Sequence, residues 1–235
     1  MLCEKPFTAT FEEAELLFAE ASRRKLFISE AMWTRCIPSV EKIREVIDSG
    51  EIGVVRTVTG VFGRHLAHVP RVARPELAGG GLLDLGIYPL NFAMMFLGED
   101  YTSAKSFITL TPEGVDAQAV IVLEYADGRV ANVMSSMTSD MGEPGAVCGT
   151  EGQIRIQSML KSQSFTLERR GVPQHEFDCS FDFNGYEYML RSVAKAVSEN
   201  RYECPEMKHE STLMAMKVMD DARRNGRVVR PGPEY

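Results

Sequence analysis

The chain has 235 residues, of which 44% are hydrophobic and 25% are charged, and its formal net charge at pH 7 is -7. This composition is that of an ordinary globular protein, and the acidic balance argues against nucleic acid or an anionic membrane as the main partner. The five cysteines are scattered and form no CxxC pair, so neither a disulfide framework nor a thiolate zinc site is expected, and a reducing cytoplasm is the expected location. The close pair His65 and His68 has no third ligand at metal-like spacing, so no metal site is predicted.

The first 33 residues predict part of a parallel α/β unit. Residues 1–3 are expected to end a strand. Thr10 and Glu13 then form a capping box, and apolar residues recur at helical spacing up to residue 21. Residues 26–33 form a short apolar run that is typical of a buried parallel strand. Because such a pair needs further strands, we expect the chain to begin inside a domain whose earlier part lies outside this sequence.

The next elements lead to a glycine run. A second amphipathic helix is predicted after Pro38, and the β-branched residues that alternate over 54–63 predict a strand. Three glycines at 79–81 then precede an apolar run over 82–97, which predicts a buried helix too short to span a bilayer. Asp84 and Tyr88 stand four residues apart, on one face of that helix. Together they are either part of a site or, alternatively, a helix cap and a core tyrosine.

The second half predicts an antiparallel meander followed by two helices, over 186–199 and 209–225. Strands are expected over 104–110, 117–125, 130–137, 146–149, 154–157, 164–169 and 174–177. Helices can cover only one face of such a sheet. The strands carry apolar side chains that suggest a sticky open face, namely Ile121, Leu123, Val133 and Met137. We therefore expect a homodimer that buries this face.

Several features taken together resemble the glucose-fructose oxidoreductase/inositol dehydrogenase (Gfo/Idh/MocA) family. Glu4-Lys5-Pro6 follows one strand, Trp33-Thr34-Arg35 ends the next, and the glycine run precedes Asp84 and Tyr88. Within the family, the sequence looks most like the dimeric dihydrodiol dehydrogenases and sugar dehydrogenases. The resemblance covers essentially the whole chain and implies an α/β (α+β) fold. Residues 1–33 would be the remnant of a Rossmann nucleotide-binding domain. Residues 34–235 would form a substrate-binding and dimerisation domain with an open, mainly antiparallel sheet and helices on one face.

Two features depart from the family's pattern. The glycine-rich nucleotide loop that precedes Glu-Lys-Pro in the family is not found in this sequence, so most of the nucleotide-binding domain is expected to be missing. Cys36 and Ile37 follow Trp-Thr-Arg, where relatives carry bulkier aromatic residues, and this leaves the lining of the pocket open.

The resemblance implies hydride transfer between NAD or NADP and a secondary alcohol or carbonyl on a sugar, polyol or cyclic trans-diol. Lys5 and Tyr88 are the implied proton-transfer pair, in which the ammonium lowers the pKa of the phenol. Asp84 would accept a hydrogen bond from a substrate hydroxyl or hold Lys5 in place. The choice between NAD and NADP is open, because the residues near the ribose belong to the segment that is expected to be missing.

The resemblance also implies binding residues. The cofactor would contact Glu4, Lys5, Pro6, Trp33 and Arg35, and the substrate would contact Phe62, Asp84 and Tyr88. Each has an ordinary structural interpretation as well: a solvated charge for Lys5, a core residue for Trp33 and a surface cation for Arg35. Two other functions remain open, a shortened non-catalytic module that binds a carbohydrate-like ligand and dimerises, and a structural subunit of a larger complex.

Overall fold

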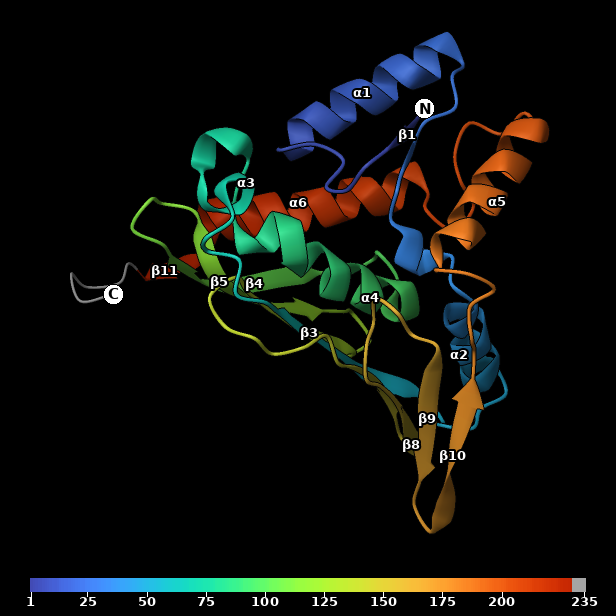
Figure 1. Ribbon diagram of the computed structural model, residues 1–235. Coiled ribbons are helices and arrows are strands. Elements are labelled where there is room, and N and C mark those ends of the chain that lie inside the picture. The colour runs from blue at the N-terminus through green and yellow to red at the C-terminus, as the bar shows by residue number, and fades with distance from the viewer. Residues whose placement is uncertain (230–235) are drawn as a thin grey trace.

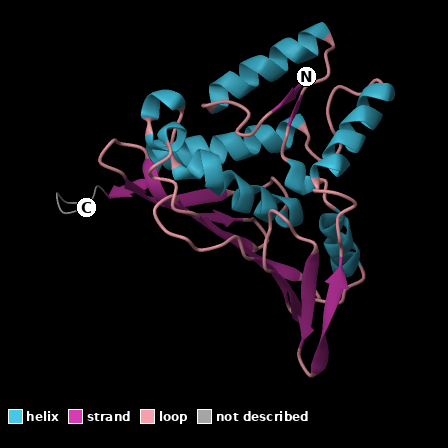
Figure 2. Ribbon diagram, in the orientation of Figure 1, coloured by secondary structure: helices cyan, strands magenta, loops and turns pink. Residues whose placement is uncertain are grey.

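A mainly antiparallel sheet organises the protein, and its helices gather on one side of that sheet (Figures 1 and 2). The computed structural model describes residues 1–229. Within them the sheet has nine strands in the order β10-β9-β8-β7-β3-β6-β5-β4-β11. The strands are β3 (Val55–Gly63), β4 (Ser103–Leu110), β5 (Asp116–Glu124), β6 (Val130–Ser136), β7 (Gly145–Gly149), β8 (Gly152–Ile156), β9 (Ser164–Arg169), β10 (Val172–Asp178) and β11 (Arg227–Val229). The helices are α1 (Phe11–Arg24), α2 (Pro38–Asp48), α3 (Pro70–Ala73), α4 (Ile87–Leu97), α5 (Tyr186–Ser198) and α6 (His209–Asn225).

The predicted meander is wrong at one point, because β3 lies between β6 and β7. It pairs in parallel with β6 and antiparallel with β7. β11 likewise adds a parallel strand beside β4 that the sequence did not predict. Strand propensity reports that a segment is extended, whereas the choice of neighbour depends on packing against the rest of the sheet. Gly60 on β3 illustrates this packing, because a Cβ there would lie 3.0 Å from the Cβ of Pro89 on α4.

The N-terminal segment forms a small parallel pair, β1 (Leu2–Cys3) with β2 (Ser29–Glu30). The strand predicted over 26–33 is shorter than expected, since Trp33–Arg35 form a 3₁₀ turn. The predicted capping box is present, with Thr10 accepting from the Glu13 backbone N–H at the start of α1. Helix α1 packs on α6 (Figure 1), so this segment shares the main core. The predicted division at residue 33 stays a prediction.

The glycine run is packed against β5. Gly80 has φ +122°, and a Cβ on it would lie 2.2 Å from Oδ1 of Asp116. The other oxygen of Asp116 accepts the backbone N–H of Leu82, where the helical segment begins. A π-helical turn over Leu82–Gly86 follows and leads into α4. The predicted alternative in which Asp84 caps this helix is therefore wrong, because Asp116 from a neighbouring strand takes that role.

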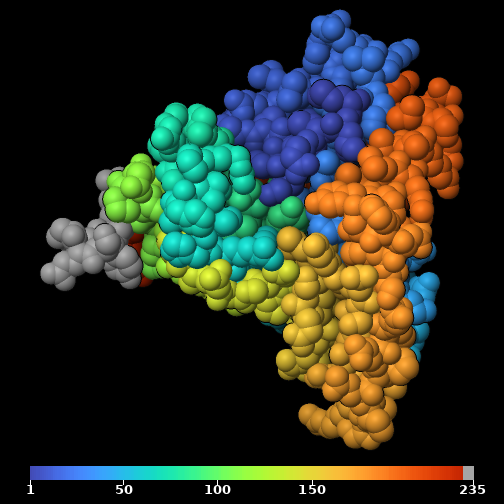
Figure 3. Space-filling model, viewed as in Figure 1, coloured from blue at the N-terminus to red at the C-terminus, as the bar shows by residue number. Residues whose placement is uncertain are grey.

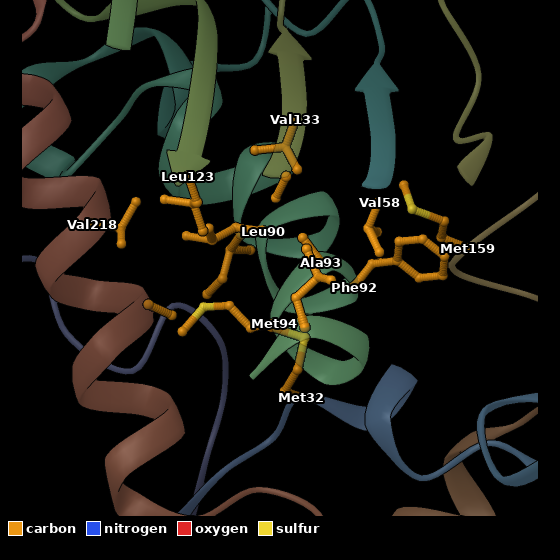
Figure 4. Close-up of a cluster of buried hydrophobic side chains, with 14 of the residues drawn as sticks. Met32, Val58, Leu90, Phe92, Ala93, Met94, Leu123, Val133, Met159 and Val218 are labelled. Atoms are coloured by element: carbon orange, nitrogen blue, oxygen red, sulfur yellow. The ribbon is translucent and has the colours of Figure 1, made fainter. Parts of the chain in front are cut away.

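Helix α4 lies at the centre of the core, against the sheet and beside α6 (Figure 4). Leu90, Ala93 and Met94 are each at most 1% exposed, and they meet side chains from β3, β5, β6 and α6. The helical stretch Pro75–Leu97, at 23 residues, is longer than the 82–97 run and is long and apolar enough to cross a membrane by length and composition alone. Since 78% of its apolar window is buried in the fold, protein already covers this stretch as a core helix.

The open face of the sheet differs from the predicted one. Ile121, Leu123, Val133 and Met137 are at most 3% exposed and belong to the covered core. The alternate positions of the same strands carry a different apolar row, formed by Phe107, Val120, Met134 and Val61 as successive cross-strand partners on β4, β5, β6 and β3. Side chains alternate between the two faces of a strand. A prediction that mistakes one face for the other therefore names the covered side chains in place of the exposed ones.

Candidate active site

Lys5, Asp84 and Tyr88 come together where the N-terminal segment meets the helical segment before α4. Lys5 Nζ donates to the backbone oxygen of Asp84 at 2.7 Å and to its Oδ1 at 3.2 Å. The same ammonium lies 4.8 Å from the centre of the Tyr88 ring. In the space-filling view, the blue N-terminal segment, the teal segment before α4 and the orange segment before α5 meet on one face (Figure 3). The fold therefore assembles the predicted trio from distant parts of the chain.

Asp84 is held by two cations. Arg71, on α3, donates from Nη1 to Oδ1 at 2.9 Å and from Nη2 to Oδ2 at 3.3 Å, while Lys5 contacts the same carboxylate. Burial would raise the pKa of Asp84, but the hydrogen bonds from Arg71 and the charge of Lys5 together hold it below its ordinary value. Asp84 thus stays an anion that fixes Lys5, which is one of its two predicted roles. Arg71 was not predicted from the sequence, since a lone arginine in a loop carries no distinctive signal.

Tyr88 differs from its predicted state. Burial raises the pKa of its phenol above the ordinary value, and an interaction with Trp33 opposes this shift only in part. The expectation that a neighbouring ammonium lowers this pKa is wrong for the described structure, in which Lys5 faces the ring. The phenol of Tyr88 is therefore protonated at neutral pH and able to donate a proton.

Aromatic side chains surround Tyr88. Phe62 at the end of β3 meets it edge to face, with ring centroids 5.7 Å apart, and is 3% exposed. Trp33 is 3% exposed and stacks on Tyr186, at the start of α5, with centroids 4.6 Å apart. Tyr186 is the partly exposed member of this group and was not predicted. The exposed ring of Tyr186 offers a face that suits an apolar ring or the C–H face of a sugar, whereas Phe62 and Trp33 are enclosed in the core.

The cofactor contact predicted for Arg35 is wrong, because its guanidinium is used inside the fold. It donates to the backbone oxygen of Glu206 at 2.8 Å, to Oδ1 of Asn91 at 2.9 Å and to Glu99 at 3.2 Å. Arg35 is 6% exposed, which leaves it closed to a ligand phosphate. A sequence shows that an arginine follows a strand, but not that three acceptors enclose it.

Comparison with known proteins gives the same family as these residues. Residues 40–155 match the GFO/IDH/MocA C-terminal domain. The trans-1,2-dihydrobenzene-1,2-diol dehydrogenase of Xenopus tropicalis is 32% identical over 240 residues, which cover 98% of this chain and 72% of that protein. The chain belongs to the GFO/IDH/MocA family. The predicted family is thereby confirmed. The human enzyme of the same name is also similar, with 30% identity over 95% of this chain and 69% of its own length.

Solved structures confirm the predicted fold of this GFO/IDH/MocA protein. A 3-ketoreductase from Actinomadura kijaniata, in complex with NADP and TDP-benzene, superposes with a TM-score of 0.89 at 23% identity, covering 98% of this chain and 72% of that chain. An aldose-aldose oxidoreductase from Caulobacter crescentus, complexed with glycerol, gives a TM-score of 0.84 at 21% identity, covering 95% and 68%. The relatives are oxidoreductases, as the sequence predicted.

The segments that follow β1 and β2 lie at the carboxyl edge of this parallel pair. In open α/β sheets, nucleotides bind outside the carboxyl ends of parallel strands. Glu4, Lys5 and Pro6 leave β1 at that end, Glu4 is exposed, and Trp33 lies shortly after β2. The segment from residue 4 to residue 10 contains no glycine, so it offers no cradle for a pyrophosphate.

Glu30 is a further residue of this edge that the sequence analysis did not single out. Its carboxylate accepts the backbone N–H of Phe7 at 3.1 Å and the hydroxyl of Thr212 at 3.0 Å. Burial raises the pKa of Glu30 to about 7, against the opposing effect of these hydrogen bonds. In this family member, Glu30 therefore ties the segment after Lys5 to α6. An acidic residue at the end of an apolar strand is the sequence feature that could have identified Glu30.

Proposed function

We propose that this chain is the substrate-binding and proton-transferring part of an NAD(P)-dependent oxidoreductase. Its substrate is a secondary alcohol, or the matching carbonyl, on a sugar, polyol or cyclic trans-diol. The observation that carries the proposal is the Lys5 ammonium held between the Asp84 carboxylate and the Tyr88 ring, at the carboxyl end of β1. The names of the relatives, which include a dihydrodiol dehydrogenase and a ketoreductase, support the reaction class.

The protein's own part in the chemistry is the proton. When bound, the nicotinamide supplies or accepts the hydride. In the reduction direction, Tyr88 donates its hydroxyl proton to the substrate oxygen, since burial keeps the phenol protonated. The oxidation direction needs the Tyr88 phenolate to accept the substrate's hydroxyl proton, so this direction is expected to speed up as the pH rises toward the pKa of the phenol.

Lys5 stabilises the charge on the substrate oxygen. An ammonium has three N–H donors, and two of them are directed at Asp84. The third is left for the substrate, and the positive charge favours an oxygen that becomes negative during the reaction. Asp84 and Arg71 keep the ammonium at its place, while Phe62, Trp33 and Tyr186 supply apolar walls that limit access of water.

We further propose that a nucleotide-binding segment outside this chain completes the cofactor site. Within residues 1–229, the parallel pair β1–β2 has no third strand, and the turn after β1 lacks glycine. Contacts on the nicotinamide side alone are too few to offset the free energy of immobilising a dinucleotide. Titration calorimetry is expected to detect no binding of NAD(H) or NADP(H) to this chain at micromolar concentration.

The test of function uses a fusion in which the nucleotide-binding segment of the Xenopus tropicalis relative precedes this chain. Oxidation of trans-dihydrodiols, sugars and inositols is followed by nicotinamide absorbance with each cofactor. Tyr88→Phe is expected to lower kcat by ~10²–10⁴-fold with little change in cofactor affinity, because general acid catalysis is lost while the ring remains. Tyr101→Phe, on a half-buried tyrosine before β4, is the matched control and should retain turnover.

A fusion that binds cofactor and turns over none of these substrates would contradict the proposed function. If Tyr88→Phe instead retains near-full turnover across the pH range, the proposed reaction class stands, but Tyr88 is not the proton donor. In that case the proton would pass through Lys5 or water.

We also propose that the protein is a homodimer through the open face of the sheet. The row Phe107, Val120, Met134 and Val61 supports this, because its members are partly or well exposed and lie side by side on four neighbouring strands. Exposed apolar patches of this kind mark association surfaces.

A further inference from the structure

Two cysteines and a glutamate form a cluster that the proposed reaction does not use. Cys36 follows the turn Trp33–Arg35, and Cys204 and Glu206 lie between α5 and α6. The Sγ atoms of Cys36 and Cys204 and a carboxylate oxygen of Glu206 all lie within 4.8 Å of one another. No thiolate metal site was expected from the sequence, because its cysteines are far apart in the chain. In the folded protein, Cys36 and Cys204 are nevertheless close together.

The backbone holds these three side chains in place. The Met207 N–H donates to the Cys204 oxygen at 3.1 Å and closes a tight turn that contains Pro205 and Glu206. The Cys36 N–H donates to the Trp33 oxygen at 3.0 Å. Arg35 joins the two segments by its hydrogen bond to the backbone oxygen of Glu206. The donor atoms are therefore positioned before any ion binds.

A hydrogen bond already joins two of the three ligand atoms. The Cys204 thiol donates to Oε2 of Glu206 at 3.1 Å, and the Ser192 hydroxyl donates to the same oxygen. Cys204 is 1% exposed, whereas Cys36 and Glu206 are half-buried, so an ion can reach the cluster from their side. A cation that replaced the thiol proton of Cys204 would keep the Cys204 Sγ and the Glu206 carboxylate close to their present places.

We propose that Cys36, Cys204 and Glu206 bind one divalent metal ion of the zinc class. Zinc binds thiolate at ~2.3 Å and carboxylate at ~2.0–2.2 Å in tetrahedral geometry, which places two sulfur ligands roughly 3.8 Å apart. The observed spread of the donors fits this geometry with small side-chain shifts. A water molecule takes the fourth position, and Ser192 orients the Glu206 carboxylate from outside the ligand set.

Charge supports an ion of this kind. Two thiolates and a carboxylate carry three negative charges, which a dication balances only in part. The guanidinium of Arg35, which donates to the backbone oxygen of Glu206, lies beside the cluster and offsets part of the remaining charge. The bound ion would fasten the turn that carries Trp33 to the segment before α6. The ion would join two segments of the fold, so this proposal stands whether or not the proposed reaction is correct.

The test is metal content. The full chain is expressed with added Zn²⁺, purified with a thiol reductant and gel-filtered, and zinc is measured by elemental analysis. About one zinc per chain is expected. The double variant Cys36→Ser and Cys204→Ser is expected to hold less than about a tenth of that. Cys148→Ser, on a half-buried cysteine of β7, is the control and should keep its zinc.

Two further measurements keep the proposal falsifiable if the double variant does not fold. Co²⁺ added to the reduced parent chain should produce a thiolate-to-cobalt absorption band, and Ser192→Ala should weaken Co²⁺ binding by ~10–100-fold. A parent chain without that band overturns the proposal. So does a folded double variant that retains zinc, or a Cys36–Cys204 disulfide that excludes metal even in the presence of reductant.

Discussion

Lys5 and Tyr88 are adjacent side chains whose roles depend on each other. The Lys5 ammonium lies against the Tyr88 ring, and both meet at the place assigned to the substrate oxygen. Losses from residues that act as one unit do not add. In the fusion described above, we expect Lys5→Met combined with Tyr88→Phe to be little slower than the slower single variant. The measurement is kcat of the parent, the two single variants and the double variant. If kcat of the double variant falls by the product of the two single effects, the two residues act independently.

Glu30 gives a second prediction at the scale of a residue. Its pKa is about 7 in the folded protein, against roughly 4.3 for an unfolded chain. The folded state therefore favours the protonated form, and this stabilisation is complete below about pH 4 and is lost as the pH rises through about 7. The change corresponds to roughly 4 kcal/mol of unfolding free energy.

We accordingly expect Glu30→Gln to flatten the fall in stability between about pH 5 and pH 8, since an amide has no proton to lose there. Urea unfolding of the parent and the variant at both pH values measures this. Asp116, whose pKa burial raises to about 6, titrates in the same window in both proteins and cancels in the comparison. An unchanged pH slope in the variant would mean that Glu30 does not carry the effect.

At the scale of an element, the start of the helical segment before α4 depends on Gly80. This residue has φ +122° and leaves room for the Asp116 carboxylate that caps Leu82. Gly80→Ala would combine a strained backbone with a steric clash, and because the control shares the strain, we expect the clash to lower the unfolding free energy by roughly 1–3 kcal/mol more than the control. Gly114→Ala is that control, since Gly114 has φ +95° with nothing within 4 Å of a built Cβ. The unfolding free energies are measured by chemical denaturation. If both variants lose the same unfolding free energy, the clash with Asp116 does not contribute.

At the scale of the whole molecule, the apolar row on the open sheet face predicts the oligomeric state. Met134→Lys would put a charge at the centre of that row, which is unfavourable to bury across an interface. We expect the parent to sediment as a dimer at micromolar concentration and this variant to shift toward the monomer. Leu16→Lys, on a side chain of α1 that is 71% exposed, should leave the dimer intact. A parent that sediments as a monomer would contradict the proposed interface.

Much of this protein is readable from local sequence. The capping box at Thr10, the alternation in β5 and β6 and the apolar run of α4 depend on residues close in the chain, and the structure has an element at each. The family was likewise readable, because its short motifs occur in a characteristic order. Lys5 and Tyr88 were found by that order, since no property of either residue by itself distinguishes it.

Tertiary structure decided everything that depends on distant partners. The insertion of β3 beside β6, the enclosure of Arg35 by Glu206, Asn91 and Glu99, and the closeness of Cys36 to Cys204 all join segments far apart in the chain. The protonation of Tyr88 belongs here too, because a pKa is set by burial and by neighbouring charges. Sequence spacing determines which residues share a helix or strand face. Which charge, thiol or ring lies opposite that face is set by the packing of the whole chain, and in this protein that packing fixes the chemistry of the site.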